Sequence, residues 1–164
     1  MFEFDQDMKM SKLEIPMFLW WCMIRQLRSR GGGRHESGAF LLAKEQSHHV
    51  IRFICYDDLD QTALESGIVR FHARGFIRLW DICGREKLTV VADIHTHPGG
   101  WTGQSDSDRT HPMIAQAGHI ALILPHFAQR TKHSLAGVGI YEYLGNHQWK
   151  SRSGDSQAVK ITLL

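Results

Sequence analysis

The chain is poor in cysteine and has no framework from which disulfides could be built. Its 164 residues include three cysteines, and Cys22, Cys55 and Cys83 are far apart. This spacing argues against a structural zinc site of the Cys-x-x-Cys type and against a disulfide-stapled secreted domain. An odd and scattered set of cysteines fits a reducing compartment, so we expect a cytoplasmic protein.

The chain also lacks a long apolar run and a strong charge of either sign. Its most apolar stretch, 16–24, is far too short to span a bilayer and is flanked by Lys12, Glu14 and Arg25. Acidic residues such as Glu3 precede this stretch, which disfavours a signal peptide. The formal net charge is +2 and the basic residues are dispersed. The composition therefore favours neither nucleic acid nor a membrane as a partner.

What the chain does have is enough apolar material for one core, because 43% of its 164 residues are hydrophobic. We treat 1–164 as a single domain, with an N-terminal helix over about 13–30 and a core over about 34–145. Pro16 suits the first turn of that helix, and three glycines from Gly31 end it. Periodicity predicts a mixed α/β fold. Helices are expected over 62–85, which Gly75 can interrupt, and over 106–117. Strands are expected over 36–43, 50–55, 88–95, 119–125 and 138–144, and at 148 and 158–164.

Side chains that can bind a metal gather after the strand predicted over 88–95. His95 and His97 stand two residues apart, so both imidazoles leave the same face of a strand. Ser105 and Asp108 stand three apart at the expected start of a helix, where they share one side of its first turn. Two neutral histidines and one carboxylate are a common ligand set for catalytic zinc, which keeps its fourth position for water. The spacing therefore predicts a zinc site.

The same residues resemble the JAMM motif of the JAB1/MPN/Mov34 metalloprotease domain, a glutamate followed far downstream by His-x-His-x7-Ser-x2-Asp. All positions of the motif are filled. The upstream segment Glu36-Ser37-Gly38-Ala39 is similar to the family's Glu-x-Gly-Gly, with Ala39 where a second glycine often stands. The resemblance covers about 13–144. The compact length is similar to that of bacterial members found beside ubiquitin-activating-like and ubiquitin-conjugating-like enzymes.

The resemblance implies a single MPN/JAB-type domain, cytidine-deaminase-like, with a central, mostly antiparallel sheet flanked by helices. It implies zinc-dependent hydrolysis of an amide or isopeptide bond at the C-terminus of a ubiquitin-like protein, in deconjugation or precursor processing. The implied partners are that protein or its conjugates, and the activating-like and conjugating-like enzymes. The implied roles are zinc binding by His95, His97 and Asp108, general base and acid catalysis by Glu36, and oxyanion stabilisation by Ser105.

Several residues near the motif have more than one interpretation. Ser105 could be a helix N-cap, a role that does not exclude an oxyanion contact. Trp101 is a candidate wall of the substrate channel or, equally, a lid over the core. Asp106 is turned to the other side of the helix from Asp108, and His111 is a surface residue or a partner of a carboxylate. The other histidines have no ligand spacing and are expected to be structural: His35, His48, His49, His72, His119, His126, His133 and His147.

Three rival functions remain open. The first is an MPN interaction scaffold without catalytic activity, although such members usually lack ligands. The second is a JAMM-type hydrolase that acts on a small sulfur-carrier protein joined to an amino acid. The third is the RadC-like group, which shares the spacing but has Asn between the histidines and Ser-Gly after the proline. This chain has Thr96 and Gly99 at those places, so the third is disfavoured.

Overall fold

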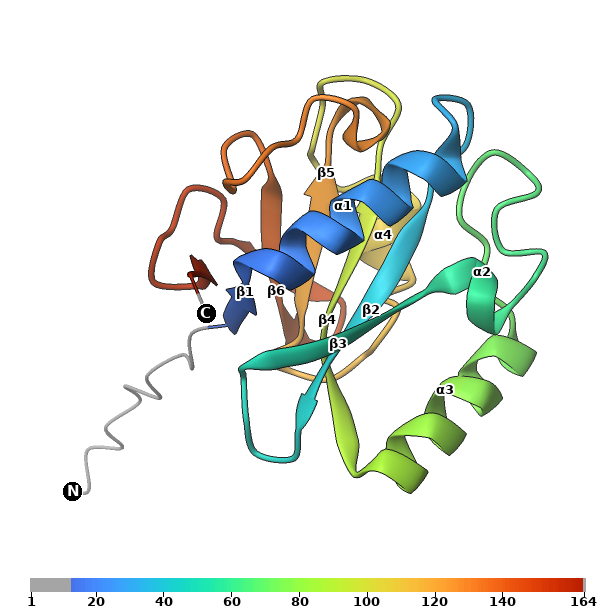
Figure 1. Cartoon of the computed structure of the whole chain (residues 1–164), viewed down its shortest axis with the longest axis vertical. Coiled ribbons are helices and arrows are strands. Elements are labelled where there is room, and N and C mark those ends of the chain that lie inside the picture. The colour runs from blue at the N-terminus through green and yellow to red at the C-terminus, as the bar shows by residue number, and fades with distance from the viewer. Residues whose placement is uncertain (1–12, 164) are drawn as a thin grey trace.

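The computed structural model describes residues 13–163, and a six-stranded sheet forms its centre (Figure 1). The strand order is β3-β2-β4-β5-β6-β7. Strands β4 and β5 are parallel, and each other neighbouring pair in this sheet is antiparallel. The predicted mixed α/β fold with a mostly antiparallel central sheet is therefore confirmed. The strands are β2 Gly38–Lys44, β3 Val50–Cys55, β4 Leu88–Thr96, β5 Ile120–Leu124, β6 Gly139–Gly145 and β7 Gln148–Ser151.

A short second sheet joins the two ends of the described chain. Strand β1, Leu13–Pro16, runs parallel to β8, Val159–Thr162. The helix predicted over about 13–30 begins later, as α1 over Met17–Gly31. The reason is that Leu13 and Ile15 alternate as buried residues, which suits a strand, whereas Pro16 has no N–H to continue one. The glycine signal at the end of the helix is confirmed, since Gly32 adopts the left-handed conformation with φ of 57°.

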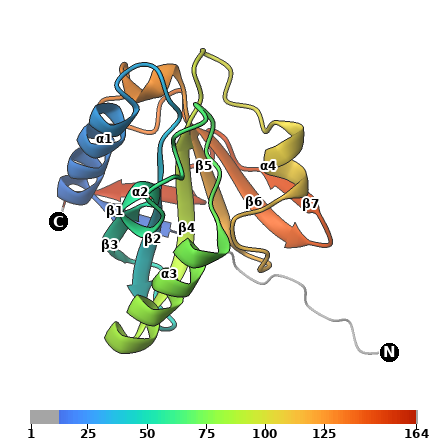
Figure 2. The ribbon, with the colours of Figure 1, turned by 90° about the vertical axis from the view of Figure 1, so that its right-hand side faces the viewer.

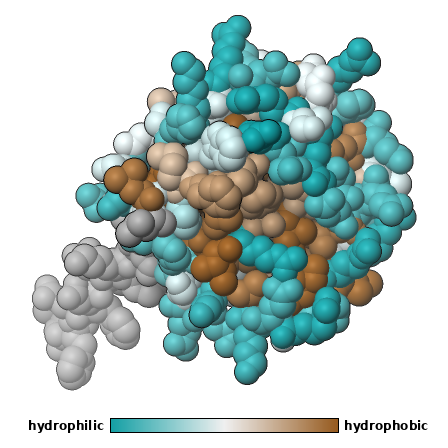
Figure 3. Space-filling view, in the orientation of Figure 1, coloured by the Kyte–Doolittle hydropathy of each residue, from teal (hydrophilic) through white to brown (hydrophobic). Residues whose placement is uncertain are grey.

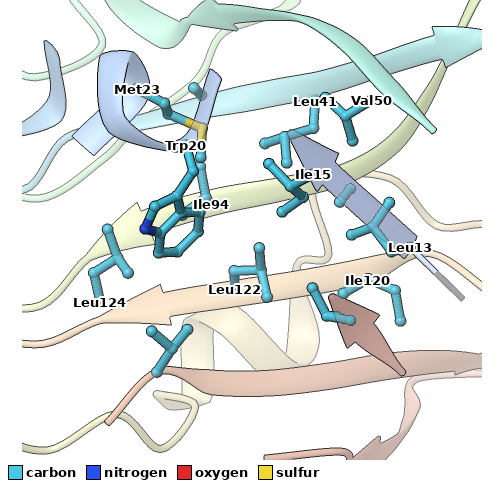
Figure 4. Close-up of a cluster of buried hydrophobic side chains, with 14 of the residues drawn as sticks. Leu13, Ile15, Trp20, Met23, Leu41, Val50, Ile94, Ile120, Leu122 and Leu124 are labelled. Carbon is cyan, nitrogen blue, oxygen red and sulfur yellow. The ribbon is translucent and has the colours of Figure 1, made fainter. Parts of the chain in front are cut away.

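The central sheet buries both faces, each under different helices. Alternation along β2 sends Leu41 to the face under α1 and Phe40 to the opposite face. Figure 4 shows Trp20 and Met23 of α1 packed over strand residues of the sheet such as Ile94. Helices α2, Tyr56–Leu59, and α3, Ala73–Glu86, supply the opposite layer. In Figure 2 α1 and α4 lie on opposite sides of the sheet.

Only the second half of the segment 62–85, which the periodicity predicts to be helical, forms a helix. Residues 60–72 form turns and irregular backbone, and α3 begins at Ala73. Gly75 does not interrupt the helix. It lies in the first turn of α3, where a Cβ would collide with the ring of Phe71. The glycine therefore permits a close approach of the loop to the helix, which periodicity alone does not reveal.

Two other predicted boundaries shift at prolines and turns. The helix predicted over 106–117 is α4, Asp106–Thr110, which ends at His111 because Pro112 disfavours helical backbone before it. Strand β2 begins at Gly38, so Glu36 lies two residues before the strand and not on it. The two C-terminal strand signals belong to different sheets, β7 in the central sheet and β8 in the short one.

The surface above α1 carries exposed aromatic side chains. Phe18 is 70% exposed and Trp21 is 41% exposed. Figure 3 shows apolar colour gathered near the centre of this face, with hydrophilic residues around it. Within residues 13–163, no helix combines the length and the apolarity needed to cross a membrane.

Candidate metal centre

Strand β4 carries both histidines of the motif to one face of the sheet. His95 lies in β4 between Ile123 of β5 and Gly38 of β2. His97 follows directly after the strand, and the two side chains leave the same face because they are two residues apart. Both residues are buried. Gly38, the partner of His95 in β2, has no room for a side chain, because a Cβ there would collide with the ring of Tyr56.

The backbone after β4 is braced by the turn after β5. The His97 amide donates to the carbonyl of Leu124 at 2.8 Å. In return, the Phe127 amide donates to the carbonyl of His97 at 2.8 Å, and the His126 amide donates to that of Gly99 at 2.9 Å. The 3-10 helix η1, His126–Ala128, therefore holds the start of the loop that leads to the rest of the motif.

The three predicted ligands converge on one point. The Nε2 atoms of His95 and His97 are 3.1 Å apart, and each lies 3.4 Å from an oxygen of Asp108. Zinc–ligand bonds of about 2.0–2.1 Å in a tetrahedron place two ligand atoms about 3.3 Å apart. The spacing of these atoms therefore fits one tetrahedral ion, and the donor set of two imidazoles and a carboxylate fits zinc.

The imidazole of His97 is oriented for metal binding by its other nitrogen. Its Nδ1 lies 3.2 Å from the carbonyl oxygen of Trp101, an acceptor, so Nδ1 can donate a proton there, which leaves the Nε2 lone pair for a metal when the ring is neutral. The indole of Trp101 stacks over the His97 ring, with centroids 5.6 Å apart and planes 22° apart. Trp101 is 63% exposed and lines the site. It lies at the rim of the cavity and is not a lid over the core.

Asp108 is fixed by a capping box at the start of α4. The Ser105 hydroxyl oxygen accepts the Asp108 amide at 3.1 Å, and the Asp108 carboxylate accepts the Ser105 amide at 2.8 Å. The predicted N-cap is confirmed, and the hydroxyl proton of Ser105 remains free to donate. Asp106 faces solvent and pairs with Arg109, as its offset from Asp108 indicated.

The electrostatics of this cluster favour an ionised carboxylate. Burial raises the pKa of Asp108, but hydrogen bonds from His95, His97 and the Ser105 amide outweigh burial and hold that pKa well below its usual range. Burial lowers the pKa of His95, but the hydrogen bond and charge of Asp108, together with the charges of Asp93 and Glu36, outweigh burial and raise that pKa. The carboxylate thus stays negative at neutral pH, the form in which it binds a metal.

Glu36 shares a cavity of about 890 Å³ with the cluster. Its amide donates to the carbonyl of Gly67 at 2.8 Å, and its carboxylate accepts the amide of Val69 at 3.3 Å. The segment that precedes β2 therefore brings the distant glutamate to the same space as the motif. The structure places every predicted site residue around this cavity: Glu36, His95, His97, Trp101, Ser105 and Asp108.

Sequence reasoning missed a buried polar network at the floor of the cavity. Asp93 lines the cavity, and its Oδ1 lies 2.6 Å from Nε2 of His119. Its other oxygen accepts the hydroxyl of Tyr56 at 3.3 Å. Asp93 shares a face of β4 with His95, so alternation was the signal that could have found it. Its pairing with His119 depends on β5 lying beside β4, which local spacing does not show.

Comparisons with known proteins support the fold more than the activity. No family model matches the sequence. A protein from Desulfitobacterium hafniense with a known solution structure aligns with a TM-score of 0.60 and 13% identity, over 91% of this chain and 92% of that one. A JAB1/MPN domain protein from Archaeoglobus fulgidus aligns with a TM-score of 0.49 and 14% identity, over 82% of this chain and 92% of that one. The first of these likenesses shows a shared fold over most of the chain.

Proposed function

We propose that the chain is a JAMM-type zinc hydrolase of the JAB1/MPN/Mov34 family. Its substrate is an amide or isopeptide bond at the C-terminus of a ubiquitin-like protein. The observation that carries the proposal is the convergence of the nitrogens of His95 and His97 with the carboxylate of Asp108 at 3.1–3.4 Å. Two further groups, Glu36 and Ser105, line the same cavity, as hydrolysis requires.

The residues of this chain divide the work of hydrolysis. Zinc bound by His95, His97 and Asp108 would supply a Lewis acid and lower the pKa of water to about 7. The Glu36 carboxylate accepts a proton from the attacking water and returns it to the departing amine. The Ser105 hydroxyl donates to the developing oxyanion, because its oxygen is already held by the Asp108 amide and its proton is free.

The rim of the cavity suits an extended, glycine-ended tail. Trp101 projects from the loop between His97 and Ser105, with its indole largely exposed. A flat aromatic wall can cover a tail that has no side chains of its own, while main-chain hydrogen bonds add affinity. The proposed partners are a ubiquitin-like protein or its conjugates, with ubiquitin-activating-like and ubiquitin-conjugating-like enzymes, in the cytoplasm.

The test uses purified chain loaded with zinc and two probes. One is ubiquitin fused through its C-terminal glycine to a short peptide, and the other is a small sulfur-carrier protein extended by one amino acid. Mass spectrometry should show cleavage after the glycine of the ubiquitin probe, and Glu36→Ala should abolish it with zinc still bound. Cleavage of the sulfur-carrier probe alone would move the substrate to that class. If the wild-type chain cleaves neither probe, and Glu36→Ala therefore behaves as the wild type does, the result favours the alternative of an interaction scaffold without catalytic activity.

A further inference from the structure

The segment 60–72 between α2 and α3 forms one wall of the cavity and contacts the proposed general base at two points. The amide of Glu36 donates to the carbonyl of Gly67, and the amide of Val69 donates to the carboxylate of Glu36. Ile68, Val69 and Arg70 all line the cavity. Figure 2 shows this segment as the green loop that rises beside the sheet from α3. The direction of the Glu36 side chain therefore depends on where this loop lies.

The loop has little regular structure of its own to define its position. It consists of turns and irregular backbone, with hydrogen bonds between residues three apart and one longer link, from the Arg70 amide to the carbonyl of Ala63 at 2.9 Å. Gly67 has a φ of +87°, a value that other residues adopt with strain. Because a loop of this length loses much conformational entropy when it is ordered, contacts beyond these turns are needed. Ala63, Val69 and Phe71 pack in the core, and the two ends of the loop are tied together at one fixed point.

That fixed point is the carboxylate of Asp60, whose side chain is fully buried. One of its oxygens accepts the backbone amide of His72 at 2.9 Å and contacts the His72 ring Nδ1 at 2.6 Å. The other accepts Nε of Arg74 at 2.8 Å and both the amide and the hydroxyl of Thr62 at 3.2 and 3.1 Å. A single side chain thus holds the first turn of the loop against its last residue.

An ionised carboxylate is the group that this arrangement requires. Burial raises the pKa of Asp60, but the hydrogen bonds from His72, Arg74 and Thr62 outweigh burial and keep that pKa below its usual range. Five donors point at two oxygens, so an amide in the same place would turn an N–H₂ group towards other donors. Asparagine would therefore loosen at least one end of the loop.

We infer that Asp60 is a positioning residue for Glu36, acting through the 60–72 loop and the Val69 amide. Asp60 does not line the cavity and takes no part in the chemistry. It closes the loop, the closed loop presents the Val69 amide, and that amide fixes the Glu36 carboxylate. The inference rests on the proposed function for its effect on turnover, whereas the coupling of Asp60 to Val69 can be measured without any substrate.

The first measurement is hydrogen exchange at the Val69 amide in the full chain. Exchange should speed up in Asp60→Asn and in Glu36→Ala, since each removes one support of the same contact. His72→Phe removes one of the five donors and serves as a milder variant if Asp60→Asn folds poorly. Two controls are matched to it. Asp58→Asn removes an exposed carboxylate that pairs with Arg30, and Met23→Ala destabilises α1, which packs on the opposite face of the sheet from the loop.

The second measurement is turnover of the ubiquitin–peptide probe. Asp60→Asn should lower kcat by about 10- to 100-fold, as expected for a misplaced general base, with KM and zinc content unchanged. Val69→Pro removes the amide donor and should lower kcat similarly, whereas Val69→Ala keeps that donor and should lower kcat by less. The double variant Asp60→Asn/Val69→Pro should be no slower than the slower single variant, because both act through one contact.

The outcomes separate this inference from the proposed function. Unchanged Val69 exchange in both Asp60→Asn and His72→Phe overturns the inference, whatever the activity. So does wild-type kcat in Asp60→Asn when Glu36→Ala is inactive, and in that case the proposed function stands. If the wild-type chain cleaves nothing but Val69 exchange still depends on Asp60, the proposed function fails and the coupling of the loop to Glu36 remains.

Discussion

The Nε2 atoms of His95 and His97 lie 3.1 Å apart, each also within 3.4 Å of the Asp108 carboxylate. At this distance one ring N–H can donate to the other ring, or both nitrogens can present lone pairs to a shared cation. The backbone that imposes the approach is rigid, because β4 is paired on both sides by β2 and β5. The group of His95, His97 and Asp108 can therefore hold a metal ion.

Ser105 should contribute to stability and to turnover in separable ways. Ser105→Ala removes the N-cap of α4, which should cost about 1 kcal/mol of unfolding free energy. It also removes the oxyanion donor, which should lower kcat by about 100-fold. Ser105→Thr keeps a hydroxyl and should restore much of both. Thermal denaturation and steady-state kinetics measure the two effects, with the exposed Ser107→Ala as control. A wild-type kcat in Ser105→Ala would mean that Ser105 acts only as the N-cap of α4 and not as an oxyanion donor.

Trp101 should bind substrate and leave the metal in place. Trp101→Ala keeps the backbone carbonyl that orients His97, so zinc content should not change. The lost aromatic wall should raise KM by about 3- to 10-fold, with a small effect on kcat. Trp80→Ala removes a tryptophan of similar exposure on α3 and is the matched control. Equal effects of the two substitutions on KM would mean that Trp101 has no special role in substrate binding.

Asp60 should make stability depend on acid pH in a defined direction. Its pKa is depressed in the folded state, so its contribution is complete above its unfolded value of about 3.9 and is lost as pH falls below that value. Asp60→Asn should therefore destabilise the chain at pH 7, by on the order of 1–3 kcal/mol for buried donors left unpaired. The difference in unfolding free energy between the wild type and Asp60→Asn should be smaller at pH 3 than at pH 7. Urea denaturation at both pH values checks this, and a constant difference would rule out the charge of Asp60 as its source.

The sequence predicts the convergence of His95, His97 and Asp108 because most of that arrangement depends on local geometry. Alternation along one strand places His95 beside His97, and the first turn of one helix places Ser105 beside Asp108. Each relation depends on fewer than four residues of backbone. The prediction that Glu36 joins this site depends on the family resemblance. The residues around Glu36 in the sequence do not indicate that it lies near a distant strand.

Other features escape prediction because they depend on contacts between distant segments. The buried pair of Asp93 and His119 forms because β5 lies beside β4, and the strand at 13–16 forms because β8 returns to it. The loop 60–72 has apolar residues at helical spacing, yet the hydrogen bonds of the Asp60 carboxylate to both of its ends hold it as turns. Local propensity cannot register such a tertiary override.

Zinc content is the most direct test of the central claim that this site is a catalytic zinc centre. Purified chain, dialysed against metal-free buffer and measured by inductively coupled plasma mass spectrometry, should contain one zinc per chain. His95→Ala and Asp108→Ala should lose it, while Glu36→Ala and the cavity-lining His111→Ala should retain it. A wild-type chain that does not retain zinc, or a His95→Ala chain that binds it equally well, would contradict the account.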